Sequence, residues 1–268
     1  MPSPPLLPGE TAAADPAVVG LYASGVSPDF AASGHGAYWG RQAAQVKETI
    51  NGWVEEYQPD YVLVMLGFND LGWFVSGPDG LITSMDELVS WTRAAKSDVN
   101  ILIANVVQRL FIDGREDLVQ NTYTYNEDLK TAVSIWSEVT SSPISYVDVA
   151  SIYQCGPEAC PDGYDGLHPA AIGEYHIAQA FANVLRDDFG MRGQDFSVPT
   201  PPSRDITTPS GFSVQAVPEG IFSSWTEVEN ARGYNIRMRI EGMTDWWSDG
   251  AVYPNTFASY FTWCLAGK

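Results

Sequence analysis

Basic residues are scarce in this sequence. It holds 14 lysines and arginines against 33 aspartates and glutamates, which gives a formal net charge of −19 at pH 7. A surface of that sign repels phosphate backbones and anionic lipids, so the composition argues against a nucleic-acid partner and against membrane attachment. It favours a neutral small-molecule or polymeric partner, and it leaves the oligomeric state open.

Long apolar runs are also absent. No stretch approaches the roughly 18 apolar residues that a transmembrane helix needs. The first residues, Met1–Pro5, have neither the basic region nor the apolar region of a secretion signal. We therefore expect no export signal in this chain.

Cysteine is rare, with three residues in the whole sequence. Two neighbouring cysteines cannot fill a tetrahedral zinc site and their spacing matches no common zinc pattern, so we expect neither a metal nor a cofactor. Cys155 and Cys160 enclose a short, turn-rich stretch and predict a disulfide, with two reduced loop thiols as the alternative. Cys264 is left over, and its role stays open.

What the sequence does contain is a regular alternation of helical and strand patterns. Helices are predicted at 40–57, 85–95, 118–139 and 170–189, and buried strands at 61–66, 100–107 and 144–149. Continuous apolar strands separated by helices indicate an α/β fold with a doubly wound parallel sheet between two helical layers. Functional loops in such sheets follow the carboxyl ends of the strands, which singles out the loop that begins at Gly67.

A proline-rich stretch divides the chain. Residues 197–210 contain four prolines and no periodicity, which predicts an extended linker. We therefore predict an α/β domain at 1–196 and a small all-β module at 211–268. The period-two pattern of half-buried strands recurs in the module at 212–216, 221–225 and 234–240.

Two loops hold side chains suited to acyl transfer. Gly67, Asn69 and Asp70 follow the strand at 61–66, and Asp165 and His168 precede the last helix. Acyl transfer needs a base, a carboxylate that orients the base, and donors aimed at the developing oxyanion. Asp165 can hold the imidazole in one tautomer, and Asn69 offers an amide N–H. Taken singly, both loops would also fit turns or helix caps without a catalytic role.

Together, the two loops resemble motif blocks of the SGNH (GDSL-like) hydrolases. Gly-x-Asn-Asp at 67–70 is similar to the third block of that family, and Asp-x-x-His at 165–168 to the fifth. The similarity covers about residues 17–195, and 33–39 looks like the second block. It implies a three-layer α/β fold and a carboxyl-ester hydrolase.

The resemblance also implies a role for individual residues. His168 would be the base and Asp165 its orienting partner, while Asn69 and Gly36 would donate to the oxyanion. Gly34 is the alternative to Gly36. Gly67 and Asp70 would support the loop.

One block of the family is missing. Its Gly-Asp-Ser segment, which carries the nucleophile, has no counterpart here. The serines upstream of Gly36 are Ser3, Ser24, Ser27 and Ser33, and none follows an apolar strand and an acidic residue. The strand pattern at 17–22 corresponds by its order to the second strand of the family. We therefore expect a truncated copy that lacks its nucleophile and its secretion signal and that is inactive as given.

The family resemblance implies a secreted protein and a small-molecule or carbohydrate ester as substrate. The β module resembles an incomplete fibronectin type III module. A different class of function is a catalytically lapsed fold that binds glycans. Its binding surface would be the loop aromatics Trp39, Phe68, Trp73 and Phe74. For Trp73 and Phe74, packing as a lid is the more common role of such residues.

Overall fold

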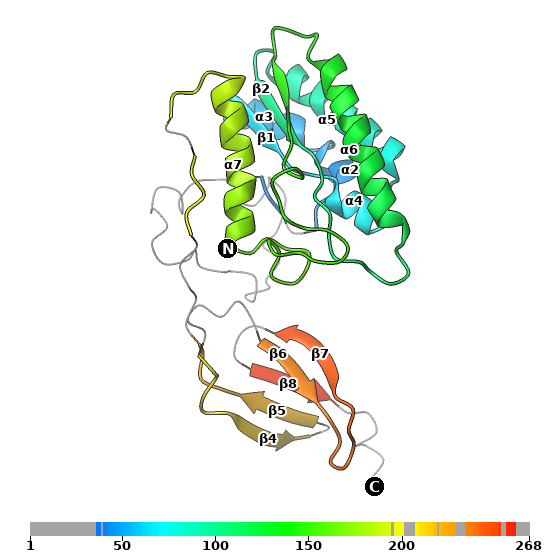
Figure 1. The fold of residues 1–268 in the computed structure, drawn as a ribbon, viewed down its shortest axis with the longest axis vertical. Coiled ribbons are helices and arrows are strands. Elements are labelled where there is room, and N and C mark those ends of the chain that lie inside the picture. The colour runs from blue at the N-terminus through cyan, green and yellow to red at the C-terminus, as the bar shows by residue number, and fades with distance from the viewer. Residues whose placement is uncertain are drawn as a thin grey trace. The chain divides into compact units, whose positions relative to one another are not determined.

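The structure is a computed structural model that describes residues 36–38, 40–193, 196–200, 207–218, 220–228, 234–252 and 256–260. The chain divides into two compact units (Figure 1). One unit spans Tyr38–Pro201, and the described residues from 207 onward belong to the other. The predicted domain and linker boundaries themselves stay a prediction.

The Tyr38–Pro201 unit has the predicted α/β architecture. Its strands are β1 (Tyr61–Val64), β2 (Asn100–Ala104) and β3 (Ile144–Val147). Its helices are α2 (Ala43–Val46), α3 (Ile50–Tyr57), α4 (Phe68–Gly72), α5 (Pro78–Ala95), α6 (Asp117–Trp136) and α7 (Ala171–Asp187). The strands form a parallel sheet in the order β1-β2-β3, with Val62 opposite Ile101 and Ile101 opposite Ile144.

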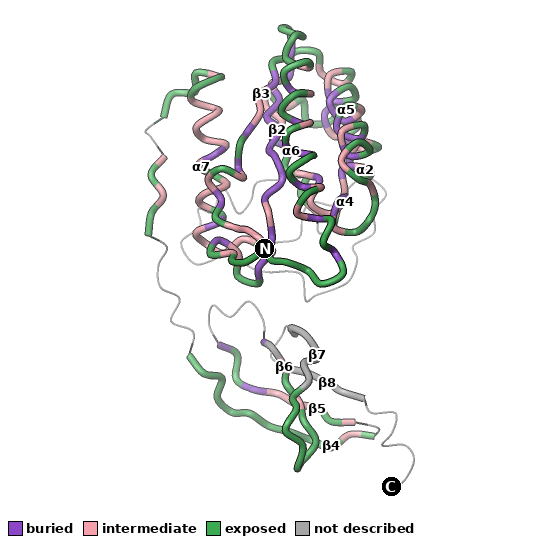
Figure 2. Tube along the Cα trace, turned by 45° about the vertical axis from the view of Figure 1, so that its right-hand side comes forward, coloured by how far each residue is buried: buried purple, intermediate pink, exposed green. Residues whose placement is uncertain are grey.

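The central strand, β2, is buried on both faces. Ile101 and Ile103 belong to the apolar cluster that includes residues of α2, α3, α5 and α6, whereas Leu102 and Ala104 belong to the cluster on the side of α7. Figure 2 shows buried residues running along the strands between these helices. This burial explains why β2 reads as an unbroken apolar run in the sequence.

The helices differ from the predicted ones at their ends. The single helix expected at 40–57 is two helices, and the Thr49 hydroxyl at the break donates to the carbonyl of Val46, a side-chain bond that competes with helical pairing. Helix α5 begins at Pro78 rather than at residue 85, because proline suits the first helical turn. Helix α4 stands where only a loop was expected.

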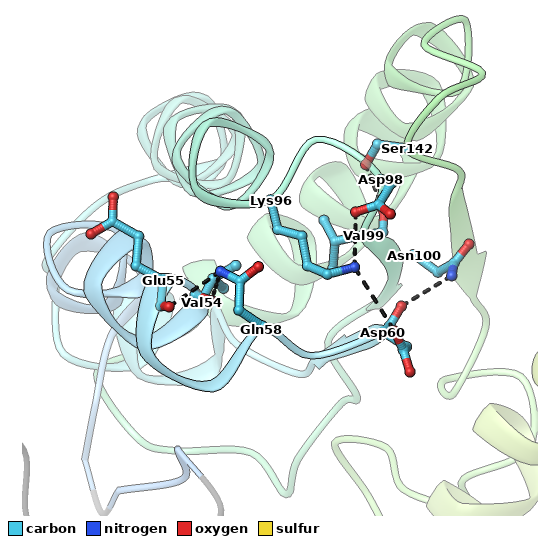
Figure 3. A network of polar contacts seen from close by, with 9 residues as sticks. All are labelled: Val54, Glu55, Gln58, Asp60, Lys96, Asp98, Val99, Asn100 and Ser142. Atoms are coloured by element: carbon cyan, nitrogen blue, oxygen red, sulfur yellow. Dashed lines mark hydrogen bonds and ion pairs between the residues drawn. The ribbon is translucent and has the colours of Figure 1, made fainter.

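The amino ends of β1 and β2 are joined by a polar network (Figure 3). Lys96 Nζ lies 2.8 Å from an Asp98 carboxylate oxygen and 3.8 Å from one of Asp60. The Asn100 side chain donates to the Asp60 carbonyl at 3.0 Å. This network lies at the amino ends of the strands. The loops that could carry chemistry lie at the opposite, carboxyl ends.

The second unit is all-β among its described residues. Its strands are β4 (Ser213–Val217), β5 (Gly220–Ser224), β6 (Tyr234–Met238), β7 (Trp247–Val252) and β8 (Thr256–Tyr260), in sheets of order β4-β5-β8 and β6-β7. Trp225 and Tyr234 pack edge to face at 5.0 Å, and the Val228 N–H donates to the Tyr234 hydroxyl. The three predicted strands are present, and β7 and β8 were not predicted.

No helix in the described parts of the chain is both long and apolar enough to cross a membrane.

Candidate active site

The first component of the site follows β1 directly. Gly67 is the N-cap of α4 and has φ 110°, a backbone region that L side chains rarely adopt. A Cβ placed on it would lie 2.8 Å from Leu81 Cδ2 and 3.0 Å from Val106 Cγ2. Conformation and space therefore both require glycine here, and the tight turn places Asn69 in the first turn of α4.

The Asn69 side chain is fixed at both ends of its amide. Its Nδ2 donates to the Arg41 carbonyl at 2.9 Å, and its Oδ1 accepts from Trp73 Nε1 at 3.1 Å. An amide nitrogen has two N–H groups, so one remains for an incoming ligand. Trp73 lies one helical turn after Asn69 and prevents the amide from turning over.

Asp70 points away from the solvent and supports the loop from inside. It is fully buried, and its carboxylate accepts the backbone N–H groups of Ala43 at 2.8 Å and Ala44 at 3.1 Å. Burial raises the pKa of Asp70, and these two hydrogen bonds only partly oppose that shift. The residue connects α4 to the amino end of α2.

The second component is the Gly163–Pro169 hairpin, which ends at the entrance to α7. Gly163 and Pro169 pair in an antiparallel bridge, and the Tyr164 N–H donates to the His168 carbonyl at 3.0 Å. The Tyr164 and His168 rings stack with centroids 5.8 Å apart. The hairpin therefore presents His168 beside an exposed aromatic ring.

The structure brings the predicted pair together in this hairpin. His168 Nδ1 lies 2.7 Å from Asp165 Oδ2, while Asp165 Oδ1 accepts the backbone N–H groups of Leu167 and His168. Burial acts to raise the pKa of Asp165, but the bonds from the His168 ring and from the backbone outweigh it, so the pKa lies below its usual value. The side chains are 41% and 60% exposed for Asp165 and His168, which leaves the imidazole accessible.

Residues after β2 hold the two loops side by side. Arg109 Nη2 donates to the Phe68 carbonyl at 3.0 Å, and its guanidinium lies 3.5 Å from the centroid of the Phe68 ring. The next residue, Leu110, donates its N–H to the Gly166 carbonyl at 2.9 Å. Burial, and then the charge of Arg115, lowers the pKa of Arg109 to about 10. Arg109 thus contacts Phe68, the residue before Asn69, while the adjacent Leu110 contacts Gly166 in the hairpin that carries His168.

The other predicted site residues have mixed outcomes. Cys155 and Cys160 form the predicted disulfide, with their Cα atoms 3.9 Å apart. Gly36 is exposed and falls outside the Tyr38–Pro201 unit, so its role as a donor stays a prediction. Gly34 and the upstream serines lie outside the described residues. Within the described residues, no serine hydroxyl contacts the His168 ring, and no three metal-ligating side chains gather.

Three features were missed by sequence reasoning. The i, i+4 spacing of Asn69 and Trp73 was a usable signal, but it needs α4, which was not predicted. Arg109 gave no signal, because its contact with Phe68 spans 41 positions. His176 Nδ1 lies 2.6 Å from Asp162 Oδ2, a contact across 14 positions that no sequence pattern indicated.

A comparison with protein families shows to which family the chain belongs. The profile of the GDSL-like Lipase/Acylhydrolase family matches residues 7–174, which is more than half of the chain. The chain belongs to this family. The matched range includes both the Gly67–Asp70 turn and the Asp165–His168 pair.

Solved structures of similar fold include several esterases. A crystal structure of a mutant acetyl esterase with acetate ion is 22% identical, with a TM-score of 0.48, and the match covers 56% of this chain and 69% of that one. Family 3 carbohydrate esterases from Talaromyces cellulolyticus and Clostridium thermocellum are 24% and 20% identical, with TM-scores of 0.44 and 0.46. Those matches cover 57% and 59% of this chain and 70% and 71% of the others. No curated protein matches the chain.

Proposed function

We propose that this GDSL-like chain carries the site of a carboxylic-ester hydrolase, with His168 as the general base. The observation that supports this most is the 2.7 Å contact between His168 Nδ1 and Asp165 Oδ2. An ionised carboxylate only accepts hydrogen bonds, so the neutral imidazole carries its proton on Nδ1 and has a lone pair on Nε2. Nε2 takes the proton of an attacking hydroxyl and later returns it to the leaving alcohol.

Asn69 would stabilise the oxyanion of the tetrahedral intermediate. Its Nδ2 has one N–H that is not used by Arg41, and Trp73 holds the amide in that orientation. Preorganised donors of this kind contribute because they need not reorient as charge develops on the carbonyl oxygen. Gly36 would add a backbone N–H.

The nucleophile would come from beyond the described residues. Among these residues β1 pairs only with β2, and Leu63 of β1 is 50% exposed. Strands of a parallel sheet in this fold class are covered on both faces and paired on both sides except at the edges. We propose that a further strand beside β1, outside the described residues, brings a serine to His168.

Hydrolysis of p-nitrophenyl acetate tests the proposal. A form extended by any in-frame upstream segment ending in Gly-Asp-Ser should turn over this ester. In that form His168→Ala should lower kcat by a factor on the order of 10⁶, and Asn69→Ala by about 10²–10³. Robust turnover of the present chain that survives His168→Ala would show that the base is wrongly assigned.

A third outcome would relocate the nucleophile. The present chain could show substantial turnover that needs His168 and one of Ser24, Ser27 or Ser33. That result would support the ester hydrolase and would contradict the proposal that the chain lacks its nucleophile. Single alanine variants of these serines distinguish the three positions.

The substrate proposed is a small-molecule or carbohydrate ester, acted on in an extracellular setting. The disulfide supports an oxidising compartment, since such bonds persist there. The net charge of −19 supports neither a nucleic-acid nor a membrane partner.

One observation favours the alternative, a glycan-binding protein without catalysis. Trp73 is 67% exposed, and Phe74 beside it is also exposed. Phe68 contributes little, because Arg109 covers its ring, and Trp39 lies outside the described residues. Calorimetric titration with a neutral xylo-oligosaccharide should show binding that Trp73→Ala removes and Trp91→Ala, an exposed control on α5, does not.

A further inference from the structure

A second histidine–carboxylate pair lies at the base of the Gly163–Pro169 hairpin. His176 Nδ1 lies 2.6 Å from Asp162 Oδ2. Asp162 is 2% exposed and the His176 side chain 14% exposed, in contrast to the accessible Asp165–His168 pair. The proposed ester chemistry assigns no role to this buried pair.

Asp162 connects three segments of the chain. Its Oδ2 also accepts the Gln154 N–H at 2.7 Å, and its own N–H donates to the Gln154 carbonyl at 3.3 Å. Its carbonyl accepts the Ala170 N–H at 2.7 Å and the Tyr153 hydroxyl at 3.2 Å. The loop before the disulfide, the base of the hairpin and the start of α7 thus meet at one residue.

Helix α7 approaches Asp162 so closely that no side chain fits between them. A Cβ on Gly173 would overlap the Asp162 carbonyl oxygen and would contact the Tyr153 ring. His176 lies about one helical turn further along α7, which directs its ring to the Asp162 carboxylate. The hairpin starts at Gly163, the residue directly after Asp162, and closes through the bridge between Gly163 and Pro169.

We infer that Asp162 and His176 are a positioning pair that fixes the base of the Gly163–Pro169 hairpin to α7 and so holds His168 against Asp165. This inference rests on the proposed function, because it gives a purpose to the orientation of His168. Neither residue touches the reacting atoms. His176 acts through Asp162, and Asp162 acts through the two ends of the hairpin.

The reach of the donor provides a matched test. The side-chain nitrogen of asparagine lies close to where Nδ1 of histidine lies, whereas that of glutamine reaches the position of Nε2. His176→Asn should therefore keep the bond to Asp162, and His176→Gln should lose it. The two variants differ by one methylene and carry the same amide, and His176→Leu removes the donor altogether.

The readout is the tautomer of the neutral His168 ring, measured by ¹⁵N and ¹³C NMR of the imidazole in the chain as it exists. The chain has three histidines, so a His168→Gln spectrum assigns the resonance. In the unmodified chain and in His176→Asn we expect the Nδ1–H tautomer. In His176→Gln and His176→Leu we expect its loss in favour of the mixture found for free histidine.

A merely structural pair would give a different result. It would lower the unfolding temperature in His176→Gln and leave the His168 tautomer of the folded molecules unchanged, which would overturn the inference. Loss of the tautomer in His176→Asn to the same degree as in His176→Gln would also overturn it, because placement of the donor would then not matter. If His176→Leu does not fold, the Asn and Gln variants still decide.

The NMR measurement needs no turnover. A chain that hydrolyses no ester in any form would contradict the proposed function, while the tautomer of His168 would still decide whether the pair positions the hairpin. Where an active form exists, His176→Gln should lower kcat and leave KM within about twofold, as expected for an orientation effect in the transition state.

Discussion

Replacing Gly67 by alanine should destabilise the α/β unit more than a glycine-to-alanine change that adds backbone strain alone, because it also adds steric overlap. Alanine at φ 110° costs about 1–3 kcal/mol in backbone strain. The added Cβ would also lie 2.8 Å from a Leu81 methyl and 3.0 Å from a Val106 methyl, and such overpacking costs about 1–3 kcal/mol. The sum, about 2–6 kcal/mol, is a large part of a net stability of about 5–15 kcal/mol.

Two control glycines separate strain from steric overlap. Gly114 has φ 77° and nothing lies within 4 Å of the position that an added methyl group would take, so Gly114→Ala should cost only the strain, about 1–2 kcal/mol. Gly52, inside α3, has neither a positive φ nor a near neighbour, so Gly52→Ala should stabilise the chain by about 0.5–1 kcal/mol.

The assay is urea unfolding followed by circular dichroism at the helical band. All described helices lie in the Tyr38–Pro201 unit, so this signal reports the unit that contains Gly67. The expected order of stability is Gly52→Ala, the unmodified chain, Gly114→Ala and Gly67→Ala. A Gly67→Ala variant as stable as Gly114→Ala would refute the argument that Leu81 and Val106 leave no room.

Three further predictions concern the site. Trp73→Phe removes the indole N–H that fixes the Asn69 amide, so kcat of an active form should fall about 3–10-fold, with KM little changed. Because the pKa of Asp165 is lowered in the folded state, its stabilising effect is complete above the ordinary carboxyl pKa of 3.8 and is lost as the pH falls through the lower folded value. The stability difference from Asp165→Asn, measured by urea unfolding, should therefore shrink as the pH falls below 3.8. Mass spectrometry of unreduced protein should show the Cys155–Cys160 disulfide intact, and reduction of that bond should lower the free energy of unfolding by about 2 kcal/mol. Two free thiols in material secreted by a eukaryotic host would contradict this prediction.

Sequence periodicity predicted the α/β unit well because its signal is local. The apolar run of β2 and the amphipathic pattern of α7 each depend on residues within one element. The Asp165–His168 contact was predictable for the same reason, since it spans three positions. The break between α2 and α3 was not, because the apolar spacing continues across it and only the Thr49 hydroxyl marks it.

Long-range polar contacts were beyond sequence reasoning. Nothing in the residues around Asp162 indicates that its carboxylate meets His176 fourteen positions later. The hydrogen bond between the Leu110 N–H and the Gly166 carbonyl joins the segment after β2 to the hairpin before α7, and no local pattern connects these two segments. Strand β7 was missed because Ser-Asp-Gly interrupts its alternation of apolar and polar residues.

The dependence of α2 on Asp70 has a consequence for the order of folding. A helix of four residues cannot form by itself, since isolated helices shorter than about 12–15 residues are marginal in water. Its first two amides, those of Ala43 and Ala44, bond to a carboxylate 27 and 26 positions later. We therefore expect helix α2 to complete only after β1 and α4 have formed. The amide hydrogens of Ala43 and Ala44 should exchange with solvent at the rate at which α4 opens.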